Sequence, residues 1–140
     1  MDPNEPNIDV RYRTILTLWF AITMSVVIFA VMTIFVPGTA PGNARLSLIL
    51  NCGGIVPLAL SFLLKSQALT KAAQQQRLDQ VQVAYVLSYA LSEMAALLAV
   101  LDHFMNAGPY YYVGFIFAGL GMLSHFPQKK HLLAASGREF

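Results

Sequence analysis

Charged residues are scarce in this sequence, and their scarcity excludes most classes of soluble protein. Asp, Glu, Lys and Arg make up 11% of the 140 residues, against about 25% in a typical soluble domain. Hydrophobic residues make up 56%, and the mean hydropathy is +0.57. A chain of this length cannot bury so many apolar side chains in a water-soluble core. We therefore expect an integral membrane protein rather than a soluble enzyme, a disordered tail or a secreted module.

Cysteine and clustered basic residues are nearly absent as well. Cys52 is the single cysteine, so no intramolecular disulfide forms, and its apolar surroundings predict a buried, inert thiol. The net charge of +2 is small and the basic residues form no patch, which argues against a nucleic-acid partner. The sequence also has no metal-binding motif, no phosphate-binding glycine loop and no catalytic Ser/His/Asp set. We expect no metal, no cofactor and no enzymatic activity.

Four apolar runs predict an all-α fold, a polytopic bundle of four transmembrane helices. They cover about residues 14–36, 46–64, 81–101 and 110–126. About 20 residues of helix cross a hydrocarbon core of roughly 30 Å, and lipid leaves the backbone no external hydrogen-bond partner. The polar stretch 65–80 is predicted to extend its flanking helices and to turn within Gln74–Asp79. Residues 128–140 are predicted to form an exposed basic tail, and residues 1–140 form one membrane domain.

Lys and Arg residues are distributed unevenly about these spans. Eight of them fall in the N-terminal segment, the 65–80 loop and the C-terminal segment, and only Arg45 falls on the other side. Cytoplasmic segments carry such an excess. The pattern predicts a multi-pass protein of the bacterial inner (plasma) membrane with both termini cytoplasmic. It also places Asp102 and His103 at the outer interface, where we expect them to be solvated.

Glu93 is the best clue to function, because it falls near the middle of the third span. A carboxyl group at that depth is costly and needs a partner or a proton. Tyr89 lies one turn away and is a candidate donor. Two interpretations stay open: Glu93 carries a proton or sodium ion, or it is a protonated structural group that bonds a neighbouring helix.

The second span offers a partner for Glu93 at the same depth. Gly53 and Gly54 permit close helix packing, Asn51 supplies an amide, and Pro57 frees a backbone carbonyl. Glu93, Tyr89 and Asn51 are thus the candidate ion-binding residues. The same second-span features are also typical of a kinked packing contact.

The segment Ser66–Val100, a quarter of the chain, resembles the helical hairpin of the rotor-ring subunit c of F-type and V-type ATP synthases. The likeness is carried by Gln75-Gln76-Arg77 in a polar loop and by Ala90-Leu91-Ser92-Glu93 midway along the second helix. The resemblance implies a cytoplasmic loop and a proton- or sodium-binding role for Glu93. The glycine run of that family's first helix is reduced here to Gly53 and Gly54.

Three functions are compatible with these observations. The first is a non-catalytic accessory subunit of a larger membrane complex, because the loops are too small to bind a substrate outside the bilayer. The second is a proton- or sodium-handling protein that uses Glu93, alone or as a homo-oligomer. The third is a binder of a lipid or quinone-like ligand at the Asn51–Pro57 kink.

Overall fold

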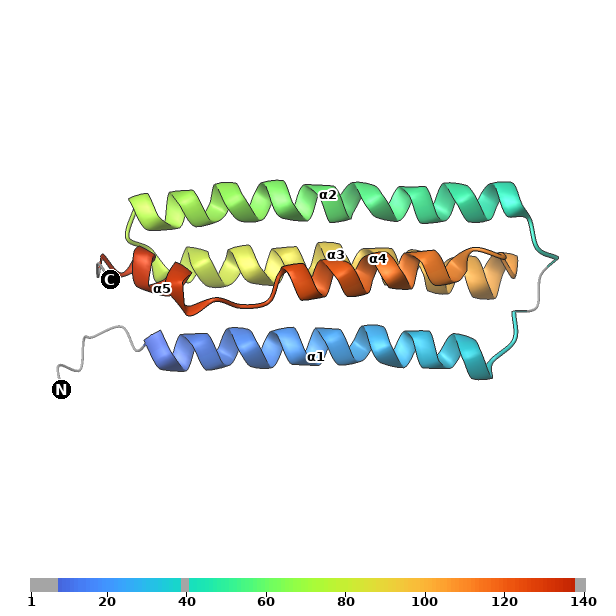
Figure 1. The fold of residues 1–140 in the computed structure, drawn as a ribbon, viewed down its shortest axis with the longest axis horizontal. Helices are drawn as coiled ribbons and strands as arrows, with labels where there is room; N and C mark the ends of the chain where they lie inside the picture. The colour runs from blue at the N-terminus through green and yellow to red at the C-terminus, as the bar shows by residue number, and fades with distance from the viewer. Residues whose placement is uncertain (1–7, 39–40, 138–140) are drawn as a thin grey trace.

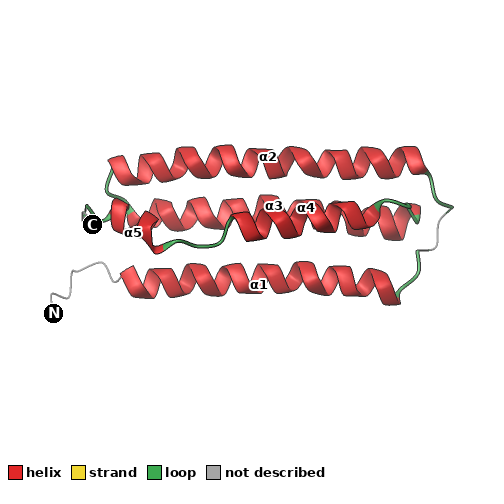
Figure 2. Cartoon of the chain, in the orientation of Figure 1, coloured by secondary structure: helices red, strands yellow, loops and turns green. Residues whose placement is uncertain are grey.

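The structure is a computed structural model that describes residues 8–38 and 41–137 (Figure 1). The described chain is all helix and connections, with no strand (Figure 2), which confirms the all-α expectation. Its five helices are α1 (Ile8–Phe35), α2 (Ala44–Gln74), α3 (Leu78–Asn106), α4 (Tyr111–Ser124) and α5 (Lys129–Ala135).

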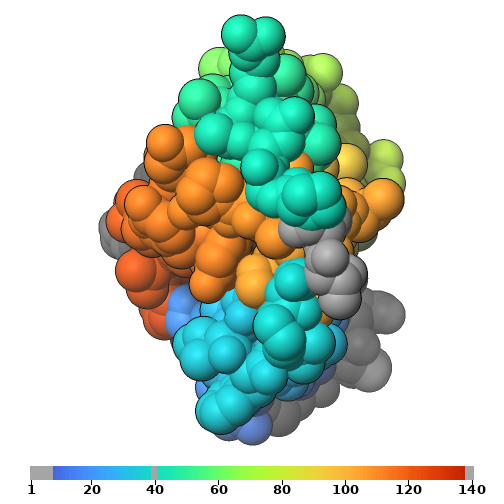
Figure 3. Space-filling view, turned by 90° about the vertical axis from the view of Figure 1, so that its right-hand side faces the viewer, coloured from blue at the N-terminus to red at the C-terminus, as the bar shows by residue number. Residues whose placement is uncertain are grey.

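Helix α3 is the centre of the bundle. It packs against each of the other helices, whereas α1 and α2 lie on opposite sides of α3 and α4 and do not contact each other in the described chain. The end view in Figure 3 shows α1 and α2 at opposite edges, with the α3–α4 connection between them. Helices α1 and α3 run in one direction and α2 and α4 in the other, so α1 begins at the end of the bundle where α5 lies.

Three helices are long and apolar enough to cross a membrane: α1, α2 and α3. Helix α4 is apolar but has only 14 residues, about 21 Å at 1.5 Å per residue. Alone it is shorter than a hydrocarbon core. Together with the connection 125–128 and α5, it follows α3 along the bundle (Figure 1).

The buried side of α2 is polar and small, and its exposed side is apolar. Gly54, Pro57 and Ala72 are buried together with four polar residues, Ser47, Asn51, Ser61 and Lys65. Leu, Ile, Val and Phe side chains cover the outer face. Such a surface would be unfavourable in water, and it is compatible with a membrane-embedded protein.

Local signals account for the helix ends. The side chain of Asn43 caps α2 by accepting hydrogen bonds from the N–H groups of Arg45 and Leu46, at 3.0 and 3.2 Å. Helix α3 ends at Asn106 and is capped by Ala107, which takes the left-handed conformation with φ 42°. The α2–α3 turn lies within Gln74–Asp79, as the sequence predicted.

The helices are longer than the predicted membrane spans. Helix α1 begins at Ile8, and α2 continues through Pro57 to Gln74, in agreement with the expectation that the 65–80 stretch extends its flanking helices. The predicted exposed tail contains α5, whose Leu132 and Ala135 are buried against the bundle. Residues 138–140 lie outside the described chain.

Candidate functional sites in the bundle

Glu93 is half-buried on the side of α3 that faces α1. Its carboxylate accepts a hydrogen bond from the hydroxyl of Ser25 on α1, and no other partner lies within the described chain. The prediction that α2 supplies the partner of Glu93 was therefore wrong, because the partner lies on α1. The predicted depth of Gly54 along α3 was close. Gly54 of α2 packs against Ala95, where an added Cβ would lie 3.3 Å from the Ala95 Cα and Cβ atoms. Residues 93 and 95 project from opposite sides of a helix, so Glu93 faces away from α2.

The structure does not bring the three candidate ion-binding residues together. Tyr89 is fully buried and packs on Tyr85, with ring centroids 5.9 Å apart, and its hydroxyl has no hydrogen-bond partner. It does not donate to Glu93. Asn51 donates to the Asp102 carboxylate at 3.0 Å and to the carbonyl of Ser47 at 2.8 Å. Glu93 is thus left with Ser25 alone.

Asp102 holds a polar cluster at the end of the bundle where α3 meets α4. It is fully buried, and its carboxylate accepts hydrogen bonds from Ser47, from Asn51 and from Asn106, the last at 2.8 Å. Gly108 is required beside it, because an added Cβ would lie 2.0 Å from Oδ1 of Asp102. The expectation of a solvated Asp102 was wrong, since α2 and the α3–α4 connection cover it.

His103 and Asn106 tie the same end of α3 to α1 and to the α1–α2 connection. His103 is buried too, contrary to expectation, and its Nε2 lies 2.7 Å from the carbonyl oxygen of Val36. Val36 directly follows the last residue of α1, so no N–H group of the helix is available to its carbonyl. Asn106 bonds both the N–H and the carbonyl of Asn43. The spacing of Ser47 and Asn51, and of Asp102 and Asn106, was a readable signal, because residues four apart share a helix face.

A second polar cluster lies toward the opposite end, between α2, α3 and the segment after α4. Lys65 is buried, with Nζ 3.4 Å from Nδ1 of His125 and 4.3 Å from the centroid of the Tyr85 ring. The other nitrogen of His125 lies 2.7 Å from the hydroxyl of Ser61, which donates to the Leu58 carbonyl. His125 Nε2–H therefore donates to Ser61, and Nδ1 accepts from Lys65.

Tyr85 connects this cluster to α5. Its hydroxyl accepts a hydrogen bond from the N–H of Gln128 at 2.9 Å and lies 2.6 Å from Nδ1 of His131. The hydroxyl proton is therefore free to be donated to a neutral His131. Burial lowers the pKa of His131, and the charges of Lys65 and Lys130 lower it further.

The expected packing residues divide into two groups. Gly54 and Pro57 are buried, and Gly54 packs against Ala95 of α3. Gly53 is exposed, and an added Cβ there would reach only Leu98 Cδ1, at 4.0 Å. Cys52 is also exposed, so the prediction of a buried thiol was wrong.

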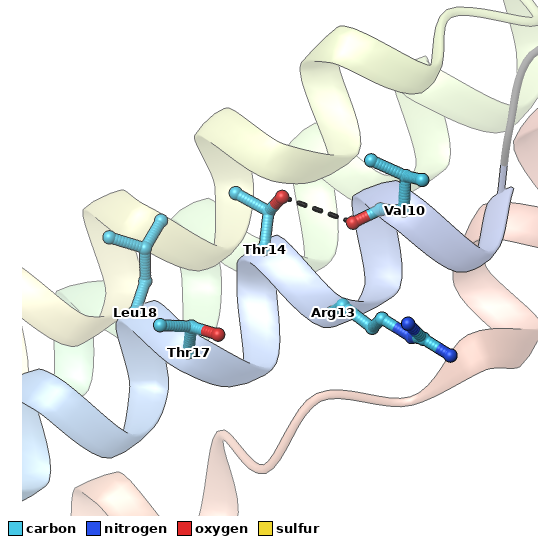
Figure 4. A pocket seen from close by; sticks show the side chains of 5 residues that line it. All are labelled: Val10, Arg13, Thr14, Thr17 and Leu18. Carbon is cyan, nitrogen blue, oxygen red and sulfur yellow. Dashed lines mark hydrogen bonds between the residues drawn. The ribbon is translucent and has the colours of Figure 1, made fainter.

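Surface grooves lie on the outer faces of α1 and α3. One follows α1 along Val10, Arg13, Thr14, Thr17 and Leu18 (Figure 4), where the Thr14 hydroxyl donates to the Val10 carbonyl at 3.0 Å. Another follows α3 from Asp79 to Ala90. Neither includes the Asn51–Pro57 segment, the expected lipid or quinone site, which is packed against α3 at Asn51 and Gly54.

Neither a metal site nor a known relative assigns a function to the chain. Within the described residues no group of three or more His, Cys, Asp or Glu side chains is placed to hold a metal ion. The chain matches no protein-family model, no curated protein and no solved structure.

Proposed function

We propose that this protein is a small integral membrane protein that acts as a non-catalytic subunit of a larger membrane assembly. The observation that carries the proposal is how the buried ionisable groups are used. Asp102, His103, Lys65 and His125 are buried and His131 is half-buried, and all five contact partners on other segments of the chain. These five groups are thus occupied in holding segments of the bundle together.

The proposed topology has four membrane segments with both termini in the cytoplasm. Seven of the eight Lys and Arg residues in the described chain belong to the start of α1, the polar end of α2, the α2–α3 turn and α5. These segments lie toward one end of the bundle (Figure 1), and Arg45 is at the other end. An excess of positive charge marks the cytoplasmic side. The fourth segment would be residues 110–126, which include α4, with α5 on the cytoplasmic side.

Helix α1 is the natural contact surface for other subunits. Only 11% of its most apolar window is buried, against 33% for α2 and 44% for α3. Its exposed face carries Phe20, Ile28 and Phe35 without a charged residue among them. Contact between this face and another transmembrane helix would bury apolar side chains at close range.

Extraction in a mild detergent combined with photo-crosslinking tests this function. A photo-reactive residue at Phe20 should give one adduct of defined mass with a protein that also co-purifies in fixed stoichiometry. The control is the same residue at Val56, which is 61% exposed on α2. A protein that runs as a monomer and gives only lipid adducts at Phe20 would contradict the proposal.

Ion handling by Glu93, as in a subunit c-like protein, is the second candidate. The half-buried carboxylate in the middle of α3 favours it, because such groups mark ion pathways in many membrane proteins. Purified protein in vesicles should then conduct protons or sodium ions, and Glu93→Gln should abolish the flux. Met94→Leu, a change at the next residue, is the matched control. Equal flux in wild type and Glu93→Gln would remove this candidate.

A further inference from the structure

Glu93 lies in the middle of an exposed apolar surface formed by two parallel helices. Ile28 and Met32 follow Ser25 by three and seven residues on α1, and both are exposed. Val86 and Leu97 flank Glu93 at seven and four residues on α3, and both are also exposed. These four residues, with Ala90, Ser25 and Glu93, are called the α1–α3 strip below.

The carboxylate of Glu93 has unused capacity for hydrogen bonds. A carboxylate can accept about four, and here it accepts one, from Ser25. The described chain contains two ion pairs, Arg77 with Asp79 and Lys129 with Asp9, and neither involves Glu93. The contrast with Asp102 is direct, because Asp102 accepts from three side chains and is fully buried.

We infer that the α1–α3 strip docks a transmembrane helix of another protein, and that this helix carries a Lys or Arg side chain at the depth of Glu93. The inference rests on the proposed subunit function and names the surface and the chemistry of the partner. A basic side chain from a partner helix would form an ion pair with the Glu93 carboxylate and use its free hydrogen-bond positions. Such a pair is stronger in the low-dielectric interior of a membrane than in water. The surrounding apolar side chains of the strip, with Ala90 as the small member, allow a helix to approach closely.

Ser25 of α1 fixes the position of the Glu93 carboxylate within the α1–α3 strip. Its hydroxyl donates to Glu93 and thereby holds the carboxylate where α1 and α3 meet. A basic group on a helix seated over the strip would approach from the open side. The two parallel helices then form the two walls of one docking surface.

Synthetic transmembrane helices test the inference without knowledge of the natural partner. The purified protein carries Leu97→Cys in a Cys52→Ser background and is placed in phospholipid vesicles with a leucine-rich helix that holds one central Lys and one Cys. The matched probe has Leu in place of Lys. We expect disulfide crosslinking to the Lys probe to exceed that to the Leu probe by about five- to thirtyfold, the range of one interhelical polar contact.

Two variants of the protein make the result specific. Glu93→Gln still accepts a hydrogen bond from Ser25 but has no charge, so the preference for the Lys probe should disappear. Met94→Leu, on the same turn, should retain the preference. Equal crosslinking of the two probes would overturn the inference, and so would an unchanged preference in Glu93→Gln or a dominant crosslink between two copies of the chain. Failure here leaves the co-purification result unaffected, so the two proposals fail separately.

Discussion

Asn106 and Asn43 exchange two hydrogen bonds across one end of the bundle. The N–H of Asn43 donates to Oδ1 of Asn106 at 3.0 Å, and Nδ2 of Asn106 donates to the Asn43 carbonyl at 3.0 Å. The same Nδ2 group also donates to Asp102 at 2.8 Å. One side chain therefore fixes the connection before α2 and orients the carboxylate that binds α2.

Asn106→Ala should lower the stability of the whole bundle. The substitution removes three hydrogen bonds and leaves polar groups of Asn43 and Asp102 without partners, a loss of about 2–4 kcal/mol. Thermal unfolding in detergent, followed by circular dichroism, measures it as a lower midpoint. Met105→Ala is the matched control, because Met105 is 72% exposed on the adjoining position and should leave the midpoint nearly unchanged. Equal midpoints for the two variants would show that the cluster adds no stability.

The sequence predicted depth along the helices better than it predicted direction around them. The antiparallel arrangement of the second and third spans placed Gly53 to Ile55 level with Glu93, and Gly54 does pack two residues from it, at Ala95. The direction in which Glu93 points depended on which side of α3 is covered by α1. Helix α1 is apolar all round, so its sequence does not indicate a preferred contact face. Glu93 was therefore assigned to α2, whereas Ser25 of α1 binds it.

The solvated interpretation of Asp102 failed for a related reason. Position near a span end suggested contact with water, but the residues after Asn106 fold back over it and Gly108 closes on the carboxylate. Apolar hydropathy defines spans and carries little information on such short connections. A search for polar residues repeated at four-residue spacing on both α2 and α3 would have found the cluster.

Gly54→Leu should separate α2 from α3. An added Cβ already lies 3.3 Å from the Ala95 backbone and side chain, so a larger group forces the helices apart at a cost of about 1–3 kcal/mol. Gly53→Leu provides the control on the neighbouring residue, where the site is open. We expect a lower unfolding midpoint in detergent for Gly54→Leu only. If both variants behave alike, the tight α2–α3 contact is absent.

Lys65 and His125 should show a strongly asymmetric response to substitution. His125→Leu removes the acceptor of Lys65 and leaves a buried ammonium group without a hydrogen-bond partner, a penalty of about 1–3 kcal/mol. Lys65→Met removes the charge and keeps an apolar chain of similar length, so it should be close to neutral. The double variant should then recover most of the stability lost in His125→Leu. Strict additivity of the two single changes in unfolding measurements would contradict this coupling.

The docking of α5 should weaken in mild acid because of His131. Burial lowers the pKa of His131 in the folded protein below its ordinary value of 6.5, so the unfolded or undocked segment binds the proton more strongly. Its contribution to stability is therefore complete above about pH 6.5 and is lost as the pH falls from there toward the folded pKa. Protonation at Nδ1 also removes the acceptor that faces the Tyr85 hydroxyl.

Hydrogen exchange of the α5 amides between pH 5 and 8, corrected for the intrinsic pH dependence of exchange, measures this effect. In the wild type, protection of the α5 amides should fall on acidification. His131→Gln cannot take up a proton, so its protection should vary little over the same range. Lys130→Ala leaves the imidazole in place and removes one nearby positive charge, which raises the folded-state pKa of His131 toward its ordinary value. The difference between the folded and unfolded pKa values is then smaller, so the loss of protection on acidification should be smaller than in wild type. An equal loss of protection in wild type and His131→Gln would show that another group controls the docking of α5.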